Sequence, residues 1–160
     1  MRILLVSDSH GNQDVLDQLI IRWPNVELYL HAGDSQQEAQ AIYPFRTVRG
    51  NCDYHFDMNE ELMLPTPFGN ILMRHKDDLT TKYIKENDIK VFIFGHTHVR
   101  CCMQKNGIAY INPGSLVEPR DEIASYAILE NTKEDVHVTF YSLEDHKPLK
   151  RYKIYELKGE

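Results

Sequence analysis

Apolar and polar positions alternate in short blocks through the first third of the chain. Three apolar runs of strand length are each followed by glycine or polar side chains, and they lie at residues 2–8, 26–34 and 45–51. Residues 13–23 place apolar side chains at helical spacing, which predicts an amphipathic helix that ends before Pro24. A second short helix is expected at residues 35–43. This order of strands and helices predicts a parallel sheet with right-handed crossovers.

The second part of the chain is richer in strands. Residues 61–75 are typical of two strands around a Pro-Thr-Pro-Phe-Gly turn, and residues 99–115 of a hairpin that turns at residues 105–107. The other elements expected are a helix at residues 79–88 and strands at residues 89–98, 125–131 and 136–143. The sequence therefore predicts one α/β (α+β) domain over residues 1–160, with two packed sheets and helices outside.

Composition excludes several classes of function. The chain has 160 residues, a formal net charge of -6 at pH 7 and 42% hydrophobic residues. A negative chain is not expected to bind long nucleic acid or an anionic membrane by broad electrostatic attraction. The apolar runs are too short to cross a bilayer, and polar residues interrupt the first run where a signal peptide would continue. Three cysteines, two of them adjacent, indicate a reducing compartment, so we expect a cytoplasmic protein.

Residues able to bind metal ions follow several of the expected strands, at the point where each strand ends. They are Asp8, His10, Asp34, Asn51, His75, His96 and His98. Taken singly, each has an ordinary alternative: the aspartates as helix caps, the asparagine as a turn former, and the histidines as solvated or strand-edge residues. Their joint distribution favours a common site, because caps and turns do not require histidines and ligand sites form at the carboxyl ends of strands.

The types of donor limit the metal. Imidazole, carboxylate and amide ligands without thiolate favour Mn²⁺, Fe²⁺, Zn²⁺ or Ni²⁺ over Cu⁺ or an iron–sulfur cluster. The set is too large for one tetrahedral ion, but it suits two divalent ions, about 3.5–4 Å apart, that share a carboxylate. The sequence therefore predicts a dinuclear centre of the kind that hydrolyses phosphate esters. The donors leave the choice among Mn²⁺, Fe²⁺, Zn²⁺ and Ni²⁺ open, and Mn²⁺ is our expectation.

These residues form motifs that resemble those of the calcineurin-like metallophosphoesterases. The matching segments, in chain order, are Asp8-Ser9-His10, Gly33-Asp34, Gly50-Asn51-Cys52-Asp53, His75 and Gly95-His96-Thr97-His98. With Asn112-Pro113-Gly114-Ser115 and Pro119-Arg120 downstream, the chain is similar to the small bacterial and archaeal phosphodiesterases of the YfcE type. The resemblance covers most of the chain and implies a metallophosphoesterase-type β-sandwich of two mixed sheets flanked by helices.

The resemblance also implies how the ligands divide between two metals. One ion would be held by Asp8, His10 and His98, the other by Asn51, His75 and His96, with Asp34 as the bridge. A hydroxide between the ions would attack phosphorus in line without a side-chain base. The two histidines of the Gly-His-Thr-His run would thus serve different ions, and Gly95 is expected to let the backbone turn there.

Two departures from the family pattern affect the expected activity. Cys52 stands where many relatives have a histidine that is a candidate general acid, and a thiol of normal pKa is a poor acid for an alkoxide. Asp53 or His55 could substitute, although loop residues without a catalytic role are the simpler interpretation. His75 is followed by Lys76 rather than by Gly-His, and the connection to the next helix is shortened, which alters the pocket rim. Lys76 could offer charge to a phosphate or be an ordinary exposed lysine.

Asn112, Gly114, Ser115 and Arg120 are further candidates, for substrate binding. The Pro-Gly turn could present backbone amides to an anion, and the arginine could approach the phosphate. A plain turn between strands and an ordinary surface arginine are the alternatives for the same residues.

The expected function is hydrolysis of P–O bonds in small-molecule or nucleotide phosphodiesters. The alternative from another class is a scaffold with little or no catalysis, resembling the retromer subunit of the same fold. Retention of every ligand type favours the enzyme, because a scaffold does not need them. A phosphomonoesterase or a dinucleoside polyphosphatase would share the metals and differ only in the pocket. The expected partner is a small phosphoester substrate, and the sequence leaves open whether the chain forms a homo-oligomer.

Overall fold

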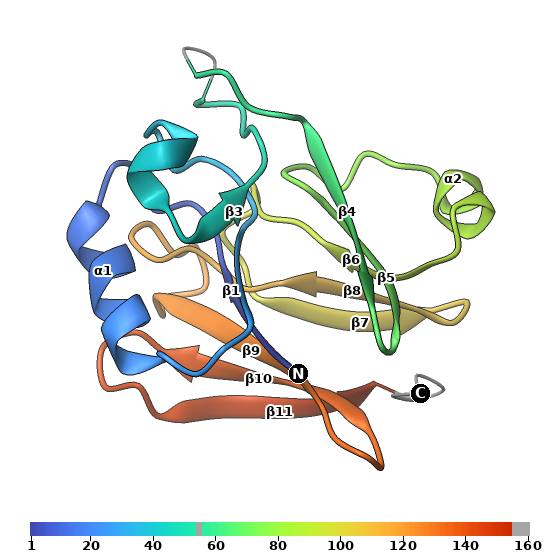
Figure 1. The fold of residues 1–160 in the computed structure, drawn as a ribbon. Coiled ribbons are helices and arrows are strands. Elements are labelled where there is room, and N and C mark those ends of the chain that lie inside the picture. The colour runs from blue at the N-terminus through green and yellow to red at the C-terminus, as the bar shows by residue number, and fades with distance from the viewer. Residues whose placement is uncertain (54–55, 155–160) are drawn as a thin grey trace.

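The computed structural model describes residues 1–53 and 56–154 of the chain. Its strands form two sheets that share an apolar core, and the helices lie on the outer sides (Figure 1). Both sheets mix parallel and antiparallel pairs. The predicted single domain of the α+β class, with two mixed sheets, is therefore confirmed.

The first sheet has the strand order β11-β10-β9-β1-β2-β3. Its parallel half consists of β1 (Arg2–Val6), β2 (Leu28–His31) and β3 (Phe45–Thr47). Its antiparallel half consists of β9 (Ser125–Asn131), β10 (Val136–Ser142) and β11 (Pro148–Ile154). Strand β1 joins the halves, because it pairs parallel with β2 and antiparallel with β9.

The second sheet has the strand order β4-β5-β6-β8-β7. Its central strands run parallel and are β5 (Gly69–Arg74), β6 (Ile89–Ile93) and β8 (Ile108–Asn112). Its edges are the antiparallel strands β4 (Glu61–Thr66) and β7 (Cys101–Lys105). Both predicted hairpins are confirmed, and the second turns at Asn106-Gly107, where both φ angles are positive as a type I′ turn requires.

Two α-helices cover the outer faces of the sheets. Helix α1 (Gln13–Arg22) begins after Asn12, whose side chain accepts a hydrogen bond from a backbone N–H of the first turn, and it buries Leu16 and Leu19 against the first sheet. Helix α2 (Thr81–Glu86) lies beside the second sheet. In the described part of the chain, no helix is both long and apolar enough to cross a membrane.

Strand β1 is buried on both faces and supports the loop that follows it. Ile3 and Leu5 belong to the core between the two sheets, whereas Leu4 and Val6 pack in the cluster beneath α1. All four side chains are fully buried. A strand that is covered on both sides holds its carboxyl end rigidly, which matters for the polar residues that come next.

The predicted helix at residues 35–43 is wrong. The structure has only a short 3-10 turn there, η1 (Ala39–Ile42). Gln36 adopts a left-handed φ of 54°, and its backbone N–H donates to Asp53 Oδ1, so this stretch is held outside helical geometry. Tertiary hydrogen bonds therefore override the local helical pattern.

Other element boundaries also differ from the sequence prediction. Strands β3 and β6 end at Thr47 and Ile93, earlier than predicted, because the next residues form loops. Strand β11 was not predicted, since its sequence PLKRYKI carries basic residues instead of an apolar face. It lies at the edge of the first sheet, where lysine and arginine discourage pairing with other chains.

Replacing Leu5 with alanine is expected to destabilise the fold strongly. Leu5 is fully buried between the sheets, and a leucine-to-alanine change in a packed core costs about 2–5 kcal/mol. Urea unfolding followed by circular dichroism measures the lost free energy of unfolding. The matched control is Ile21→Ala, because Ile21 is 78% exposed on α1, so its loss should cost under about 0.5 kcal/mol. Equal losses in the two variants would contradict this core assignment.

Candidate metal centre

The candidate ligands lie on loops that leave strands of both sheets. The first sheet contributes the loops after β1, β2 and β3, and the second sheet contributes those after β5 and β6. In chain order, the side chains that they carry are Asp8, His10, Asp34, Asn51, His75, His96 and His98. Each of these side chains has an atom within 4.0 Å of another member of the set. The structure thus brings all seven predicted residues together.

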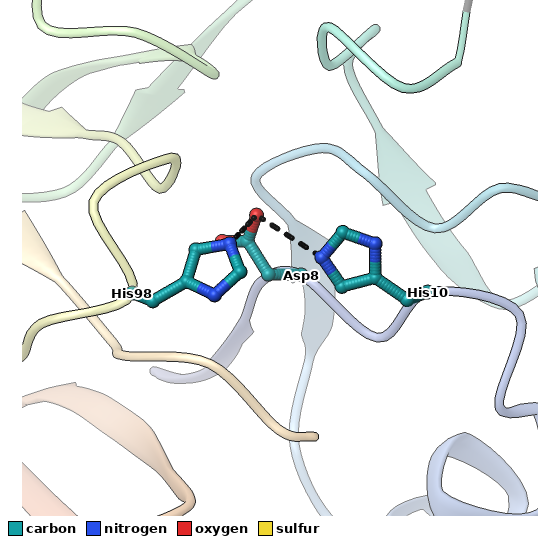
Figure 2. Close-up of side chains that lie close together, drawn as sticks. All are labelled: Asp8, His10 and His98. Atoms are coloured by element: carbon teal, nitrogen blue, oxygen red, sulfur yellow. Dashed lines mark ion pairs between the residues drawn. The ribbon is translucent and has the colours of Figure 1, made fainter. Parts of the chain in front are cut away.

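One group of ligands forms around the carboxylate of Asp8. Its Oδ1 lies 3.2 Å from His98 Nε2 and 4.0 Å from His10 Nε2, as the dashed lines in Figure 2 show. Asp8 is fully buried, and its other oxygen, Oδ2, accepts a hydrogen bond from the Ser7 hydroxyl at 2.6 Å. Oδ1 is therefore the atom that faces both imidazole rings.

The second group forms around His75. Its Nε2 lies 3.1 Å from Asp34 Oδ2 and 3.0 Å from Asn51 Oδ1, and the same asparagine oxygen lies 3.1 Å from His96 Nδ1. Asp34 has ligand atoms close to His75 and also close to His10 of the first group. This position between the groups is the one that a bridging carboxylate requires.

Three of the histidine rings are oriented by acceptors on their far side. Nδ1 of His75 lies 2.8 Å from the Ala32 carbonyl, and Nδ1 of His98 lies 2.6 Å from the Glu118 carbonyl. Nδ1 of His10 lies 2.9 Å from Gln36 Oε1. Because a carbonyl oxygen only accepts, each Nδ1 carries a proton, and Nε2 is the ring nitrogen that faces the carboxylates. This is the support that metal-binding histidines usually have.

Lone pairs that face carboxylate oxygens need a cation or a proton between them. Asp8 Oδ1 and His10 Nε2 are buried and have no hydrogen-bond partner among the described residues. Leaving such atoms unpaired costs about 1–3 kcal/mol each. A divalent ion would satisfy both, and imidazole with carboxylate is a donor set that such ions accept. The residues present therefore fit a metal centre.

The charge state of the site suits cation binding. Burial opposes ionisation of Asp34, but hydrogen bonds from His75 and from the Cys52 backbone N–H hold its pKa at about 2. Burial likewise opposes protonation of His75, yet Asp34 and Asp8 raise the pKa of this ring. A proton and a metal ion thus compete for the same position.

Two glycines permit the loops of the site to approach each other closely. A Cβ at Gly50 would lie 2.0 Å from Asp34 Oδ1, and one at Gly95 would lie 2.0 Å from Ser7 Oγ and 2.8 Å from Asp8 Oδ2. Gly95 does not have a left-handed φ. The expected turn is present, since the Thr97 N–H donates to the Gly95 carbonyl at 2.8 Å, and the lack of a side chain on Gly95 is the further feature that the site requires.

The backbone is strained where it presents the ligands. Five of the seven candidate ligands have a left-handed φ between 45° and 69°, and they are Asp8, His10, Asp34, His96 and His98. Residues other than glycine pay roughly 1–2 kcal/mol for this conformation. Such strain gathers at functional sites, where the surrounding structure holds it in place.

Asp53 holds two of the loops together and is not placed to donate a proton. It is fully buried, and its Oδ2 accepts hydrogen bonds of 2.8 Å from the backbone N–H groups of Asp34 and Gly50. Its Oδ1 accepts a third, also of 2.8 Å, from Gln36 N–H. With both oxygens used in this way, the general-acid role considered for Asp53 is wrong. His55, the other candidate for that role, lies outside the described residues.

Cys52, at the position of the family's candidate acid, lies beside the ligands. Its backbone N–H donates to Asp34 Oδ1 at 2.8 Å. Burial raises the pKa of its thiol, and the neighbouring Asp34 charge raises it further. The side chain therefore stays a neutral thiol at physiological pH.

The candidate substrate-binding residues near the Pro-Gly turn support the ligand loops. Asn112 is fully buried and donates from Nδ2 to the Gly95 carbonyl and to Thr97 Oγ1, both at 3.0 Å. Its Oδ1 accepts from Gly114 N–H, and the Ser115 hydroxyl donates to the Asp8 carbonyl at 3.0 Å. Arg120 is exposed, and its backbone N–H donates to the His98 carbonyl. Contact of these residues with a substrate stays a prediction.

His31 is a supporting residue that sequence reasoning missed. It is fully buried at the end of β2. Its Nδ1 accepts a hydrogen bond from the Gly33 N–H at 3.1 Å, so the ring proton is on Nε2. This Nε2–H donates to Ser9 Oγ at 2.8 Å. The ring thereby ties the loop after β1 to the loop after β2. Burial lowers its pKa to about 3, so it is neutral in the folded protein. Its position at the end of an apolar run, next to Gly33-Asp34, is the sequence feature that could have indicated this supporting role.

A methyl group at Gly50 is expected to remove metal from the site. In a Gly50→Ala variant the new Cβ would collide with Asp34 Oδ1 and displace this carboxylate. Bound metal, measured by plasma mass spectrometry after gel filtration, should fall at least about tenfold. Gly107→Ala is the matched control: its turn position has a left-handed φ but open space, so stability falls while metal content stays. Full metal content in Gly50→Ala would contradict the assigned geometry.

The neutral state of His31 makes stability depend on pH. Its pKa is about 3 in the folded protein against the ordinary 6.5, so its contribution is complete above pH 6.5 and declines as the pH falls toward 3. The difference in free energy of unfolding between the wild type and His31→Asn should therefore shrink as the pH is lowered from 7.5 to about 5. Denaturant unfolding at each pH measures it, and a constant difference would show that His31 is not held neutral.

Two bacterial proteins are similar to this chain over most of its length. A Bacillus subtilis protein, the probable metallophosphoesterase YsnB, is 35% identical over 153 residues, which cover 88% of this chain and 90% of that protein. The phosphodiesterase YfcE of Escherichia coli is 24% identical over 164 residues, covering 82% of this chain and 88% of YfcE.

Solved structures show the same fold. A conserved protein of Streptococcus pneumoniae, described as a phosphoesterase by prediction, has a TM-score of 0.84 at 24% identity and covers 95% of this chain and 97% of its own. A Vps29 structure with Zn²⁺ from Entamoeba histolytica has a TM-score of 0.72 at 20% identity, covering 96% of this chain and 99% of its own. The family model for the calcineurin-like phosphoesterase superfamily domain matches residues 1–134. The chain belongs to the calcineurin-like phosphoesterase superfamily.

Proposed function

We propose that this protein is a metal-dependent phosphodiesterase that hydrolyses small-molecule or nucleotide phosphodiesters at a dinuclear centre. The observation that carries the proposal is the set of imidazole Nε2 atoms turned toward buried carboxylates, with Asp8 Oδ1 and His10 Nε2 lacking a hydrogen-bond partner among the described residues. Such an arrangement is costly for a protein that binds no cation. Membership of a phosphoesterase superfamily supports the same chemistry.

The ligands divide into two sets in this proposal. Asp8, His10 and His98 would hold one ion, and Asn51, His75 and His96 would hold the other. Asp34 would be the shared ligand, since its carboxylate lies close to His75 and to His10. When bound, two divalent ions would supply Lewis-acid stabilisation of phosphate charge and a nucleophilic hydroxide at neutral pH. Mn²⁺ is the proposed metal, with Ni²⁺, Fe²⁺ and Zn²⁺ as substitutes that this donor set also accepts.

The remaining residues of the centre keep these ligands in place and limit the leaving group. Asp53, Asn112 and Ser115 hold the ligand loops through buried hydrogen bonds. Cys52 remains a neutral thiol of raised pKa and gives little help to a poor leaving group. Esters with good leaving groups are therefore the substrates that this site turns over fastest. The name of the relative YfcE, a phosphodiesterase, supports the choice of a diester over a monoester.

A scaffold with little or no catalysis is the competing function. Vps29 structures with TM-scores of 0.72 to 0.77 share the fold of this chain. The neutral thiol of Cys52 and the shortened rim favour it modestly. The complete donor set and its supporting hydrogen bonds favour the enzyme, because an interaction surface does not need them. The scaffold becomes the preferred function only if the following experiment fails.

Asp34→Asn is expected to abolish activity and to release metal. The bridge would lose its charge, so both ions would bind weakly and hydrolysis of bis(p-nitrophenyl) phosphate with Mn²⁺ should fall at least about 100-fold. Turnover is followed by release of p-nitrophenolate, and bound metal by plasma mass spectrometry on the same samples. Trials with Ni²⁺, Fe²⁺ and Zn²⁺ identify the preferred metal.

Asp17→Asn is the matched control for this variant. Asp17 carries the same charge but lies on α1, where it accepts a hydrogen bond from Gln13. Its loss should leave turnover and metal content unchanged. No turnover above buffer in the metal-loaded wild type would reject the enzyme, and wild-type metal content in Asp34→Asn would reject the bridge.

A further inference from the structure

A recess opens on one side of the centre, next to two of its ligands. It has a volume of about 320 Å³ and borders Asn51 and His75. Its wall also contains Arg49, Arg74 and Lys76, together with Glu60 and Asp78. Basic side chains thus gather at one flank of the centre in a chain whose formal net charge is -6. The proposed metal ligands do not account for this group of basic side chains, because none of the three is a ligand.

The acidic residues of the recess are engaged by a single arginine. Arg74 pairs with Asp78, with Nε at 3.1 Å from Oδ1 and Nη2 at 3.3 Å from Oδ2, and its Nη1 lies 3.9 Å from Glu60. Hydrogen bonding to Asp78 raises the pKa of Arg74 still further, so its charge is permanent. Arg74 brings one positive charge to two carboxylates, so the three cations and two anions of the recess leave a net charge of +1.

Arg49 and Lys76 make no close ion pair with a carboxylate of the described residues, although the charge of Lys76 adds to the Arg74 hydrogen bond in lowering the pKa of Asp78. The guanidinium of Arg49 donates from Nη2 to the Phe56 carbonyl at 3.1 Å, and its buried Nε has no partner within the described ranges. The Lys76 side chain is exposed, and no ion pair or hydrogen bond to another described residue holds its ammonium group. A desolvated guanidinium nitrogen without a partner is costly, which favours an anion nearby.

The position of Lys76 follows from the short connection between β5 and α2. Only residues 75–80 link Arg74 to the helix, and the pair between Arg74 and Asp78 closes this loop back on the end of β5. Lys76, directly after the ligand His75, is thereby held at the recess. The short connection between β5 and α2 thus leaves the recess open and places a positive charge at its edge.

We propose that this recess binds a second anionic group of the substrate, a carboxylate or phosphate carried on one ester group of the diester. Lys76 is the specificity-determining residue, and Arg49 and the fixed Arg74 add to the positive potential. The inference rests on the proposed phosphodiesterase function. It narrows the substrates to phosphodiesters with at least one further negative charge beside the scissile phosphate.

A matched pair of chromogenic diesters tests the recess. 4-Carboxyphenyl 4-nitrophenyl phosphate and its carboxamide counterpart have nearly the same shape and release the same nitrophenolate, but only the first carries the extra charge. The wild-type enzyme with Mn²⁺ should prefer the carboxylate about fivefold in kcat/KM, mainly through KM, as a partly exposed ion pair allows. A 4-phosphonophenyl ester shows whether phosphate-like anions are preferred over carboxylates.

Lys76→Gln should bring the preference for the anionic diester close to one. Lys82→Gln is the matched control, because it removes the same charge from a lysine of α2 that is 85% exposed and lies outside the recess. This control should keep the wild-type preference. Metal content is measured for each variant, and a loss of metal in Lys76→Gln that explains its loss of activity would overturn the proposed role.

Binding without turnover separates the failure of this inference from that of the proposed function. Calorimetry should give a lower Kd for 4-carboxyphenylphosphonate than for phenylphosphonate in the Mn²⁺-loaded wild type, and similar values in Lys76→Gln. Equal Kd values for the two phosphonates, together with equal kcat/KM values for the two diesters, would overturn the proposed anion-binding role of the recess. Measurable turnover in the same experiment would still support the proposed phosphodiesterase function. If the Kd difference is preserved but no turnover is seen, the proposed phosphodiesterase function is rejected, whereas the anion-binding role of the recess is supported.

Discussion

The closest approach between loops is the constraint on which this structure depends. Gly50 lies against Asp34 and Gly95 lies against Asp8, at distances where no Cβ would fit. These contacts let the loops of two different sheets place their side chains within ligand distance of each other. The buried strands fix where each loop starts, and the hydrogen bonds of Asp53 and Asn112 fix how it continues.

The chemical properties of this close-packed region come from histidine rings that face buried carboxylates. Carbonyl or amide acceptors orient three histidine rings through Nδ1, so that Nε2 of each ring faces the carboxylates of Asp8 and Asp34. Each element of the arrangement is unfavourable by itself: buried charge, unpaired acceptors and left-handed backbone. A shared cation would relieve the first two costs together, and the surrounding fold sustains the third.

Local patterns explain what sequence reasoning could and could not predict. The buried strands and the proximity of the seven candidate ligands could be predicted because apolar runs end in chemically distinctive residues. Metal binding by these residues, and their division between two ions, stay predictions. The helix at residues 35–43 failed because Asp53, distant in sequence, redirects the backbone at Gln36. The roles of His31 and Asp53, and the recess of Arg49 and Lys76, depend on partners that only tertiary structure brings near. Strand β11 was missed because a basic edge strand has no apolar face to recognise.

The division of the centre between two sheets has a consequence for the whole molecule. Ions bound there would connect the loops of one sheet to those of the other. Metal affinity and the free energy of unfolding would then be thermodynamically linked, because only the folded protein brings the ligands together. An ion present at 100 times its Kd adds about 2.7 kcal/mol of stability per site. Reciprocally, a substitution deep between the sheets would weaken metal affinity without touching a ligand. Cellular metal supply would then set the lifetime of this protein as well as its activity.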